Sequence, residues 1–275
     1  MDNYAVFGNP IAHSKSPLIH RLFAEQTEQA LLYQAQHVEL NNFAGAVAEF
    51  FAAGGLGINI TVPFKGQAWK AVDDCSLGAS KAKAVNTIKQ LENGDLFGAN
   101  TDGIGLCNDL QNNLNWPIHN QRILVIGAGG AARGVLMPLL NCQPELLAIS
   151  NRTMEKARSL AIDFEDSGAI TALERNQLKR EQFDLVINAS STSLNGELPQ
   201  VPASIWSERT RAYDMFYGSA DTVFVRWAKE HKVATAADGL GMLVEQAAEA
   251  FELWRGVRPV TMDVIQVLRE HLASS

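Results

Sequence analysis

The sequence predicts an α/β protein of two domains, and three observations carry that prediction. Strand-like and helix-like runs alternate along the N-terminal third, which is the order of a mostly parallel sheet covered by helices. The turn Glu92-Asn93-Gly94 separates two apolar runs and indicates a hairpin, so part of this sheet is antiparallel. A second series of strands begins at Arg122, after a polar loop. The 275 residues, 47% of them apolar, suffice for two medium domains.

The elements of the first domain follow from periodicity and turn residues. Alternating or continuous apolar residues predict strands, and apolar residues at helical spacing, such as Leu18 and Leu22, predict helices. Strands are expected at 4–7, 33–39 and 57–62, helices at 17–30 and 43–53, and hairpin strands at 84–91 and 95–99. Gly54-Gly55 ends the second helix and Pro63 ends the third strand.

The second series predicts another sheet and a returning C-terminus. A connecting helix is expected at 101–113, strands at 122–126, 146–149, 183–187 and 211–215, and a helical region from Asp238 to the end. That last region carries an apolar stripe, and we expect it to pack on the first domain. The predicted domains are 1–101 plus 240–275 and 102–239, with the functional site in the cleft between them.

The strand at 122–126 ends in the glycine turn Gly127-Ala128-Gly129-Gly130-Ala131, and a helix is expected to follow at once. Gly127 permits the tight turn, Gly129 lets the backbone approach a pyrophosphate, and Ala132 allows close packing of helix on strand. The N-terminus of that helix offers free N–H groups to phosphate. The sequence therefore predicts a Rossmann-type dinucleotide site; a glycine-rich turn without a nucleotide is the alternative.

The next strand ends at Ser150-Asn151-Arg152-Thr153, where an acidic residue would bind the ribose of NAD. No acid stands there, and Arg152 is followed by Lys156. Two cations at this place suit the additional 2′-phosphate of NADP. We therefore predict NADP as the cofactor.

Composition excludes several other classes of protein. A formal net charge of −7 without a basic tract argues against a nucleic-acid partner. No apolar run is long enough to span a bilayer, and the N-terminus does not resemble a signal peptide. The three cysteines and six histidines lack the spacing of metal ligands or of a disulfide framework. We expect a cytoplasmic protein without a metal and without a membrane partner.

Lys65 and Asp102 are the candidates for proton transfer. Lys65 stands just beyond a predicted strand, where parallel sheets place their sites, and lysine delivers a proton when its surroundings permit. An aspartate beside it would hold the ammonium in place and share its proton. Two other interpretations remain open at this point, a solvated surface lysine at 65 and a helix N-cap at Asp102.

Four further polar residues are candidates for substrate binding. Ser14 and Ser16 lie in one loop and offer hydroxyls to a carboxylate or a polyol, although Ser16 before Pro17 also fits a helix N-cap. Asn86 is a polar residue in an apolar strand, and a buried amide needs partners. Gln246 lies on the last predicted helical region, where a solvated side chain is the simpler interpretation.

Together these motifs resemble the shikimate dehydrogenase family, in the order in which that family carries them and over essentially the whole chain. The matching segments are Gly8-Asn-Pro-Ile-Ala-His-Ser14-Lys-Ser16-Pro, Asn59-Ile-Thr61-Val-Pro-Phe-Lys65, Ala84-Val-Asn86-Thr, Asn100-Thr-Asp102-Gly, Gly127-Ala-Gly-Gly-Ala, Asn151-Arg-Thr153 and Asp238-Gly-Leu-Gly-Met-Leu. The stretch Ser190–Gly196 matches the family's loop only loosely. The resemblance implies an oxidoreductase of aromatic amino-acid biosynthesis that reduces 3-dehydroshikimate to shikimate with NADPH.

The resemblance also implies roles for single residues. Lys65 and Asp102 would be catalytic, and Ser14 and Ser16 would hold the substrate carboxylate. The remaining substrate-binding residues would be Asn59, Thr61, Asn86, Tyr217 and Gln246, together with the catalytic pair. Cofactor binding would fall to the glycine turn, Asn151, Arg152, Thr153, Lys156, Met215 and Gly239. An NAD-using quinate/shikimate dehydrogenase and a nucleotide-sensing module without turnover are the alternatives, and we expect a monomer or a homodimer.

Overall fold

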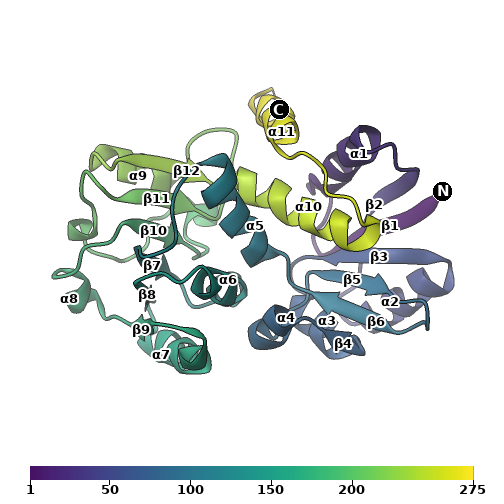
Figure 1. The fold of residues 1–275 in the computed structure, drawn as a ribbon, viewed down its shortest axis with the longest axis horizontal. Coiled ribbons are helices and arrows are strands. Elements are labelled where there is room, and N and C mark those ends of the chain that lie inside the picture. The colour runs from purple at the N-terminus through teal and green to yellow at the C-terminus, as the bar shows by residue number, and fades with distance from the viewer. Residues whose placement is uncertain (275) are drawn as a thin grey trace. The chain divides into compact units, whose positions relative to one another are not determined.

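A computed structural model describes residues 1–274, and over these residues it contains two six-stranded sheets. The chain divides into two compact units. The first unit comprises Met1–Gly105 and Val244–Val264, and the second comprises Leu106–Leu243 and the residues from Ile265 on. Each unit has one of the two sheets (Figure 1). The predicted two-domain α/β fold is confirmed. No helix in the described part of the chain is both long and apolar enough to cross a bilayer.

The first sheet has the order β2-β1-β3-β5-β6-β4. Its elements are β1 (Asp2–Gly8), α1 (Ser16–Gln26), β2 (Leu31–His37), α2 (Phe43–Ala52), β3 (Gly55–Ile60), α3 (Lys65–Ala71), β4 (Asp74–Cys75), α4 (Leu77–Ala82), β5 (Thr87–Gln90) and β6 (Leu96–Ala99), and α5 (Asp102–Asn108) follows. β1 pairs in parallel with β2 and β3, whereas β5 is antiparallel to both β3 and β6. The Asn-Gly turn therefore forms the expected hairpin inside a mixed sheet.

Residues of β1 alternate between two cores because successive side chains of a strand point to opposite faces. Ala5 and Phe7 belong to the cluster that α2 and α3 cover. Tyr4 and Val6 belong to the cluster that contains Trp254 of α10 (Leu240–Arg255). Both faces of the sheet are thus buried.

The order of the strands reverses at β1, which has β2 on one side and β3 on the other. The loops that leave β1 and β3 lie side by side, because the Asn9 N–H donates to the Val62 carbonyl at 3.1 Å and the Thr61 N–H to the Phe7 carbonyl at 2.9 Å. Open α/β sheets bind ligands at such a reversal, outside the carboxyl ends of the strands. The fold therefore marks this edge as the candidate site of the first unit.

The second sheet is parallel throughout and has the order β12-β11-β10-β7-β8-β9. Its elements are β7 (Arg122–Ile126), α6 (Gly130–Asn141), β8 (Leu146–Ser150), α7 (Met154–Asp163), β9 (Ile170–Ala172), α8 (Arg175–Leu178), β10 (Leu185–Asn188), β11 (Arg211–Asp214), α9 (Val223–Glu230) and β12 (Thr235–Asp238). This order is that of a dinucleotide-binding fold, with its reversal at β7.

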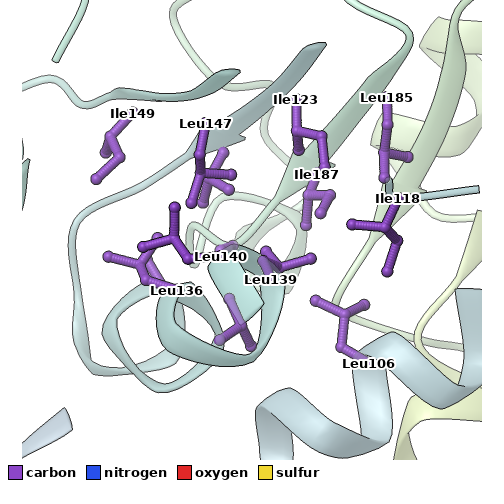
Figure 2. Close-up of a cluster of buried hydrophobic side chains, with 14 of the residues drawn as sticks. Leu106, Ile118, Ile123, Leu136, Leu139, Leu140, Leu147, Ile149, Leu185 and Ile187 are labelled. Atoms are coloured by element: carbon purple, nitrogen blue, oxygen red, sulfur yellow. The ribbon is translucent and has the colours of Figure 1, made fainter. Parts of the chain in front are cut away.

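The core of the second unit forms where α6 packs on the sheet. Figure 2 shows Leu136, Leu139 and Leu140 beside Ile123 and Leu147 of the strands. The intervening strand residues belong to another cluster on the opposite face, which α8 and α9 cover. Alternate residues of each strand are thus buried on alternate faces, as a sheet wound by helices on both sides requires.

The C-terminal region differs from the sequence prediction in two respects. The expected continuous helical region is two helices, α10 and α11 (Met262–Ala273), because Gly256 adopts a φ of +69° and Pro259 follows. The predicted return to the first unit holds for α10 from Val244 on, whereas residues from Ile265 on group with the second unit. There Arg269 of α11 makes two hydrogen bonds to Asp238, at 2.6 and 2.7 Å.

Candidate functional site

Lys65 and Asp102 form an ion pair in the first unit. The Lys65 Nζ atom lies 2.6 Å from Asp102 Oδ2, and the two side chains are 31% and 15% exposed. The pair is therefore partly shielded from water yet still accessible. The structure brings together two residues that lie 37 positions apart in the sequence, and it excludes a lysine that only faces solvent.

The topology of the sheet explains why these two residues meet. β3 and β6 run in the same direction because each is antiparallel to β5 between them, so the chain segments that follow β3 and β6 start at the same edge. Lys65 is the first residue of α3, and Phe64 before it is fully buried and anchors that start. Asp102 is the first residue of α5, where its N–H donates to Asn100 Oδ1 at 3.2 Å.

Asn86 holds the other oxygen of the carboxylate. It stands just before β5, whose start lies at the same edge because β5 runs the opposite way. Its Nδ2 donates to Asp102 Oδ1 at 2.8 Å, and its Oδ1 accepts from the Thr101 N–H at 2.8 Å. The side chain is buried, and these partners fix which end of the amide faces Asp102. Asn86 thus has the partners that a buried amide needs.

Gln246 of α10 closes the same group. Its Oε1 accepts from Thr101 Oγ1 at 3.4 Å and from Asn86 Nδ2 at 3.5 Å. The close approach depends on Gly105 of α5, since a Cβ there would lie 2.6 Å from the Gln246 backbone nitrogen. Gln246 is therefore not the solvated glutamine of the simpler interpretation.

Ser14, Ser16 and Thr61 are all partly buried beside the reversal at β1. The Ser16 N–H donates to Ser14 Oγ at 3.3 Å. Ser16 is not an N-cap, because α1 begins at Ser16 itself and the preceding residue makes no side-chain cap. Thr61 approaches the chain at Gly8, where a Cβ would lie 2.5 Å from its methyl carbon.

Asn59 differs from the other predicted substrate residues because its amide is bonded within the unit. Its Oδ1 accepts from the Tyr33 hydroxyl at 2.7 Å, and its Nδ2 donates to Thr87 Oγ1 at 3.0 Å and to the Asn86 carbonyl at 3.3 Å. Both amide hydrogens are thus occupied. The buried hydroxyls of Tyr33 and Thr87 were not predicted from the sequence, because nothing local marks a strand threonine or tyrosine as a partner of a distant amide.

The second unit presents the glycine turn at the reversal at β7. Gly127 has a φ of +119°, and a Cβ there would lie 2.9 Å from the Ala189 carbonyl group, so only glycine fits. A Cβ on Gly129 or Gly130 would meet nothing within 4 Å. The start of α6 is therefore open, and its N–H groups fit a phosphate as the motif predicted.

The turn after β8 presents the predicted basic residues to solvent. Asn151 Nδ2 donates to the Thr153 carbonyl at 2.9 Å and closes the turn. Arg152 and Lys156 are exposed, and within residues 1–274 neither side chain has an ion-pair partner. Ser150, the last residue of β8, is buried. The turn therefore offers positive charge where a ribose phosphate is expected.

Met215 and Gly239 lie next to each other beyond β11 and β12. A Cβ on Gly239 would collide with the Met215 carbonyl, and the Gly239 N–H donates to the Phe216 carbonyl at 3.1 Å. Tyr217, in the same segment, is partly buried, and burial raises the pKa of its phenol. These three predicted residues are thus placed beside one another in the chain segments at the carboxyl edge of the sheet.

Asp214, which the sequence analysis missed, fixes this region. The carboxylate is fully buried at the end of β11 and accepts from Ser193 and Thr222 hydroxyls, both at 2.6 Å, and from Asn188 Nδ2 at 3.0 Å. Burial raises the pKa of Asp214, and these hydrogen bonds oppose the shift. The loosely matching loop at 190–196 is therefore anchored through Ser193. The available signal was an acid inside the strand predicted at 211–215.

Comparisons with known proteins match the whole length of the chain. Family models match residues 6–88 (shikimate dehydrogenase substrate binding domain), 109–196 (shikimate/quinate 5-dehydrogenase) and 239–269 (shikimate 5′-dehydrogenase C-terminal domain). Among curated proteins, the chain is 51% identical to a shikimate dehydrogenase (NADP(+)) of Cellvibrio japonicus over 98% of both chains. It is 52% identical to that of Aeromonas salmonicida over 100% of both chains.

Solved structures agree with these matches. An Ael1 enzyme from Pseudomonas putida superposes with a TM-score of 0.93 at 45% identity, covering 98% of both chains. The shikimate 5-dehydrogenase of Thermus thermophilus, solved with NADP(H) and shikimate, superposes with a TM-score of 0.89 at 33% identity, covering 99% of this chain and 100% of that one. The protein therefore belongs to the shikimate dehydrogenase family.

Proposed function

We propose that this protein is an NADP-dependent shikimate dehydrogenase that catalyses the reversible reduction of 3-dehydroshikimate to shikimate. The observation that carries the proposal is the bonded group of Lys65, Asp102, Asn86 and Gln246, in a chain that belongs to this family. An ammonium held by a carboxylate is a proton donor and acceptor of the kind that a carbonyl–alcohol conversion needs. The reaction is an oxidoreduction at a CH–OH group.

The second unit has the features that NADP binding requires. The open start of α6 at Gly129 and Gly130 suits a pyrophosphate, and Gly127 permits the tight turn before it. We propose that Arg152 and Lys156 bind the 2′-phosphate, with Asn151 and Thr153 shaping their turn. Met215 and Gly239 would contact the nicotinamide. The proposed division is therefore substrate and catalysis in the first unit, cofactor in the second.

The nicotinamide of the bound cofactor supplies a hydride to the carbonyl carbon, or takes one from the alcohol. The residues of this chain handle the proton. In reduction the Lys65 ammonium gives its proton to the oxygen that becomes the alcohol, while Asp102 keeps the ammonium beside that oxygen. In oxidation the same pair receives the alcohol proton. The two groups lie within hydrogen-bond distance, so they handle the proton as one unit.

The remaining polar groups orient the substrate. Ser14 lies in the loop after β1 and Ser16 begins α1, and both residues are partly buried, which suits a carboxylate. Thr61, Asn86, Gln246 and Tyr217 are proposed to contact the ring hydroxyls and carbonyl. Because the Asn59 amide is fully bonded inside the unit, we propose that Asn59 orients its neighbours.

Two finer proposals concern the state of the protein. Cys75, Cys107 and Cys142 are all free thiols, which fits the reducing cytoplasm that we propose as its location. We propose a monomer or a homodimer, which sedimentation or light scattering distinguishes.

An assay of NADP⁺ reduction tests the function. The purified protein is mixed with shikimate or quinate, each with NADP⁺ or NAD⁺, and the absorbance of the reduced cofactor is followed. We expect turnover to be fastest with shikimate and NADP⁺. Preference for NAD⁺ or quinate would establish the alternative dehydrogenase, and cofactor binding without turnover would establish the sensing module.

A further inference from the structure

A series of buried hydrogen bonds runs beneath the candidate substrate site of the first unit. The Tyr33 hydroxyl donates to Asn59 Oδ1 at 2.7 Å, and Asn59 Nδ2 donates to Thr87 Oγ1 at 3.0 Å. Thr87 Oγ1 donates to Asn86 Oδ1 at 3.0 Å, and Asn86 Nδ2 donates to Asp102 Oδ1 at 2.8 Å. The first four members are all buried, and Thr87 is 0% exposed. The series thus ends on the carboxylate that holds Lys65.

The series has one direction, because every member donates toward Asp102. Thr87 has a single hydroxyl proton, and once this is given to Asn86 its oxygen is left to accept from Asn59. Turning over Asn59 would set its amide oxygen against the Asn86 carbonyl oxygen, and turning over Asn86 would set its amide hydrogens against the Thr101 N–H. Hydrogen bonds aligned in this way polarise one another and are more costly to break when buried. Thr87 therefore links the orientation of the Asn59 amide to that of the Asn86 amide.

The opposite end of the series is Tyr33 of β2. Its phenol donates to Asn59, and burial raises its pKa well above the usual value, so it keeps its proton. The ring stacks on His20, with centroids 4.0 Å apart and planes 10° apart. Burial lowers the pKa of His20 to about 3, against a smaller opposing effect of Asn59. The far end of the series is therefore uncharged and packed in place.

We propose that Tyr33 and Thr87 are positioning residues that orient the Asp102–Lys65 pair through the two asparagines between them. This inference rests on the proposed function and goes beyond it. The aligned series holds the Asn86 amide with Nδ2 toward Asp102, and Asn86 in turn holds one oxygen of the carboxylate whose other oxygen binds Lys65. The two hydroxyls therefore contribute to turnover by fixing the geometry of the proton-transfer pair.

Substitutions at the two hydroxyls test the positioning role. Thr87→Val keeps the shape of the side chain and removes its hydroxyl, whereas Thr87→Ser retains the hydroxyl. Tyr33→Phe removes the first donor of the series. We expect Thr87→Val and Tyr33→Phe to lower kcat about tenfold, the scale of one buried hydrogen bond, with the KM for NADP⁺ unchanged. The solvent deuterium isotope effect on kcat should rise, because proton transfer becomes slower relative to the other steps. Thr87→Ser should regain most of the activity.

Thr210→Val is the matched control. Thr210 is also 0% exposed, and its hydroxyl donates to the Phe183 carbonyl at 2.9 Å in the second unit. It should lose stability like Thr87→Val and keep kcat and the isotope effect. An equal loss of kcat in both variants would reduce Thr87 to a structural role. If Thr87→Val fails to fold, Tyr33→Phe gives the same readout.

A double-mutant cycle separates this inference from the proposed function. Tyr33→Phe is measured alone and in the Thr87→Val background. We expect the combined loss of kcat to be smaller than the product of the two single losses, because the second substitution acts on an already broken series. Multiplying effects, or a Thr87→Val enzyme with normal kcat, would overturn the positioning role while leaving the proposed function intact. A wild-type protein that does not turn over shikimate would overturn both.

Discussion

The two candidate sites stand at equivalent places in the two sheets and are built in opposite ways. Each lies at the carboxyl edge of its sheet, where the strand order reverses at β1 or β7. In the first unit the functional side chains are bonded to one another, as Lys65 is to Asp102 and Asp102 to Asn86. In the second, the start of α6 is open and Arg152 is exposed.

The difference follows from the chemistry each site performs. Proton transfer needs groups held in fixed geometry before the substrate arrives, so its residues stabilise one another. Anion binding needs donors that are still unsatisfied, so its backbone N–H groups and cations face the solvent. Substitutions should therefore have coupled effects in the first unit and separable effects in the second.

The largest effect is expected at Lys65. Lys65→Ala removes the proposed proton donor, and kcat should fall by about a hundredfold or more, with a modest change in the KM for shikimate. Adding Asp102→Asn should cost little further, since the pair acts as a unit. Steady-state kinetics measure both. Lys70→Ala, an exposed lysine on the same helix α3, is the control and should retain activity. Near-normal turnover of Lys65→Ala would remove Lys65 from the chemistry.

A smaller, local effect is expected at Arg152. Arg152→Asp removes a cation from the proposed 2′-phosphate site and adds a repelling charge, so the KM for NADP⁺ should rise about ten- to a hundredfold. The KM for NAD⁺, which lacks that phosphate, should change little, and kcat at saturation should be retained. Arg175→Asp makes the same charge change at another exposed arginine of this unit and should leave both constants alone. Equal weakening of the two cofactors would contradict the assignment.

The first unit should also lose stability in acid because of His20, whose ring stacks on Tyr33. Its pKa is about 3 in the folded protein, below the usual 6.5, because the ring is fully buried. Below pH 6.5 the His20 ring binds a proton in the unfolded chain but not in the folded protein. The contribution of the neutral ring to the free energy of unfolding is therefore complete above pH 6.5 and is lost as the pH falls toward 3. The loss approaches about 1.4 kcal/mol per pH unit.

Urea denaturation between about pH 4 and pH 7 measures this slope, since the unfolded histidine takes up its proton in that range. His20→Phe keeps an aromatic ring in the stack and should flatten the slope by up to that amount, whereas His119→Phe, at an exposed position of the second unit, should not. The comparison of slopes removes the contribution of carboxylates, which all variants share. Identical slopes in the wild type and His20→Phe would contradict a neutral, buried His20.

The parts of the fold that local patterns specify were predictable from the sequence. The apolar runs indicated most strands, the Asn93-Gly94 turn indicated the hairpin, and the glycine turn indicated the start of α6. The two-residue strand β4 and the strand β12, Thr-Ala-Ala-Asp, carry no periodicity to detect. The break between α10 and α11 was signalled by Gly256 and Pro259, which the prediction passed over.

Part of the candidate site was likewise predictable from the sequence and part was not. Lys65 and Asp102 were predictable as residue types at the ends of strands, but their 2.6 Å contact depends on two antiparallel pairings that bring their segments to one edge. Tyr33 and Thr87 were missed because hydrogen-bond partners far apart in the sequence leave no local pattern, whereas Asp214 was an acid within a predicted strand that the prediction passed over. For the same reason, the inward bonding of Asn59 became visible only in three dimensions.

Gly129 is a position where a substitution should change cofactor binding without changing the folding of the protein. Its φ of −91° is open to any residue, and a methyl group there would touch nothing within 4 Å. An alanine at position 129 would thus leave the fold unchanged but reduce the space for a phosphate at the first turn of α6. An alanine at position 127 would instead collide with the backbone of Ala189, just after β10. A Gly129→Ala protein would supply a well-folded reference, unable to hold NADP⁺, whose shikimate affinity can be measured in isolation.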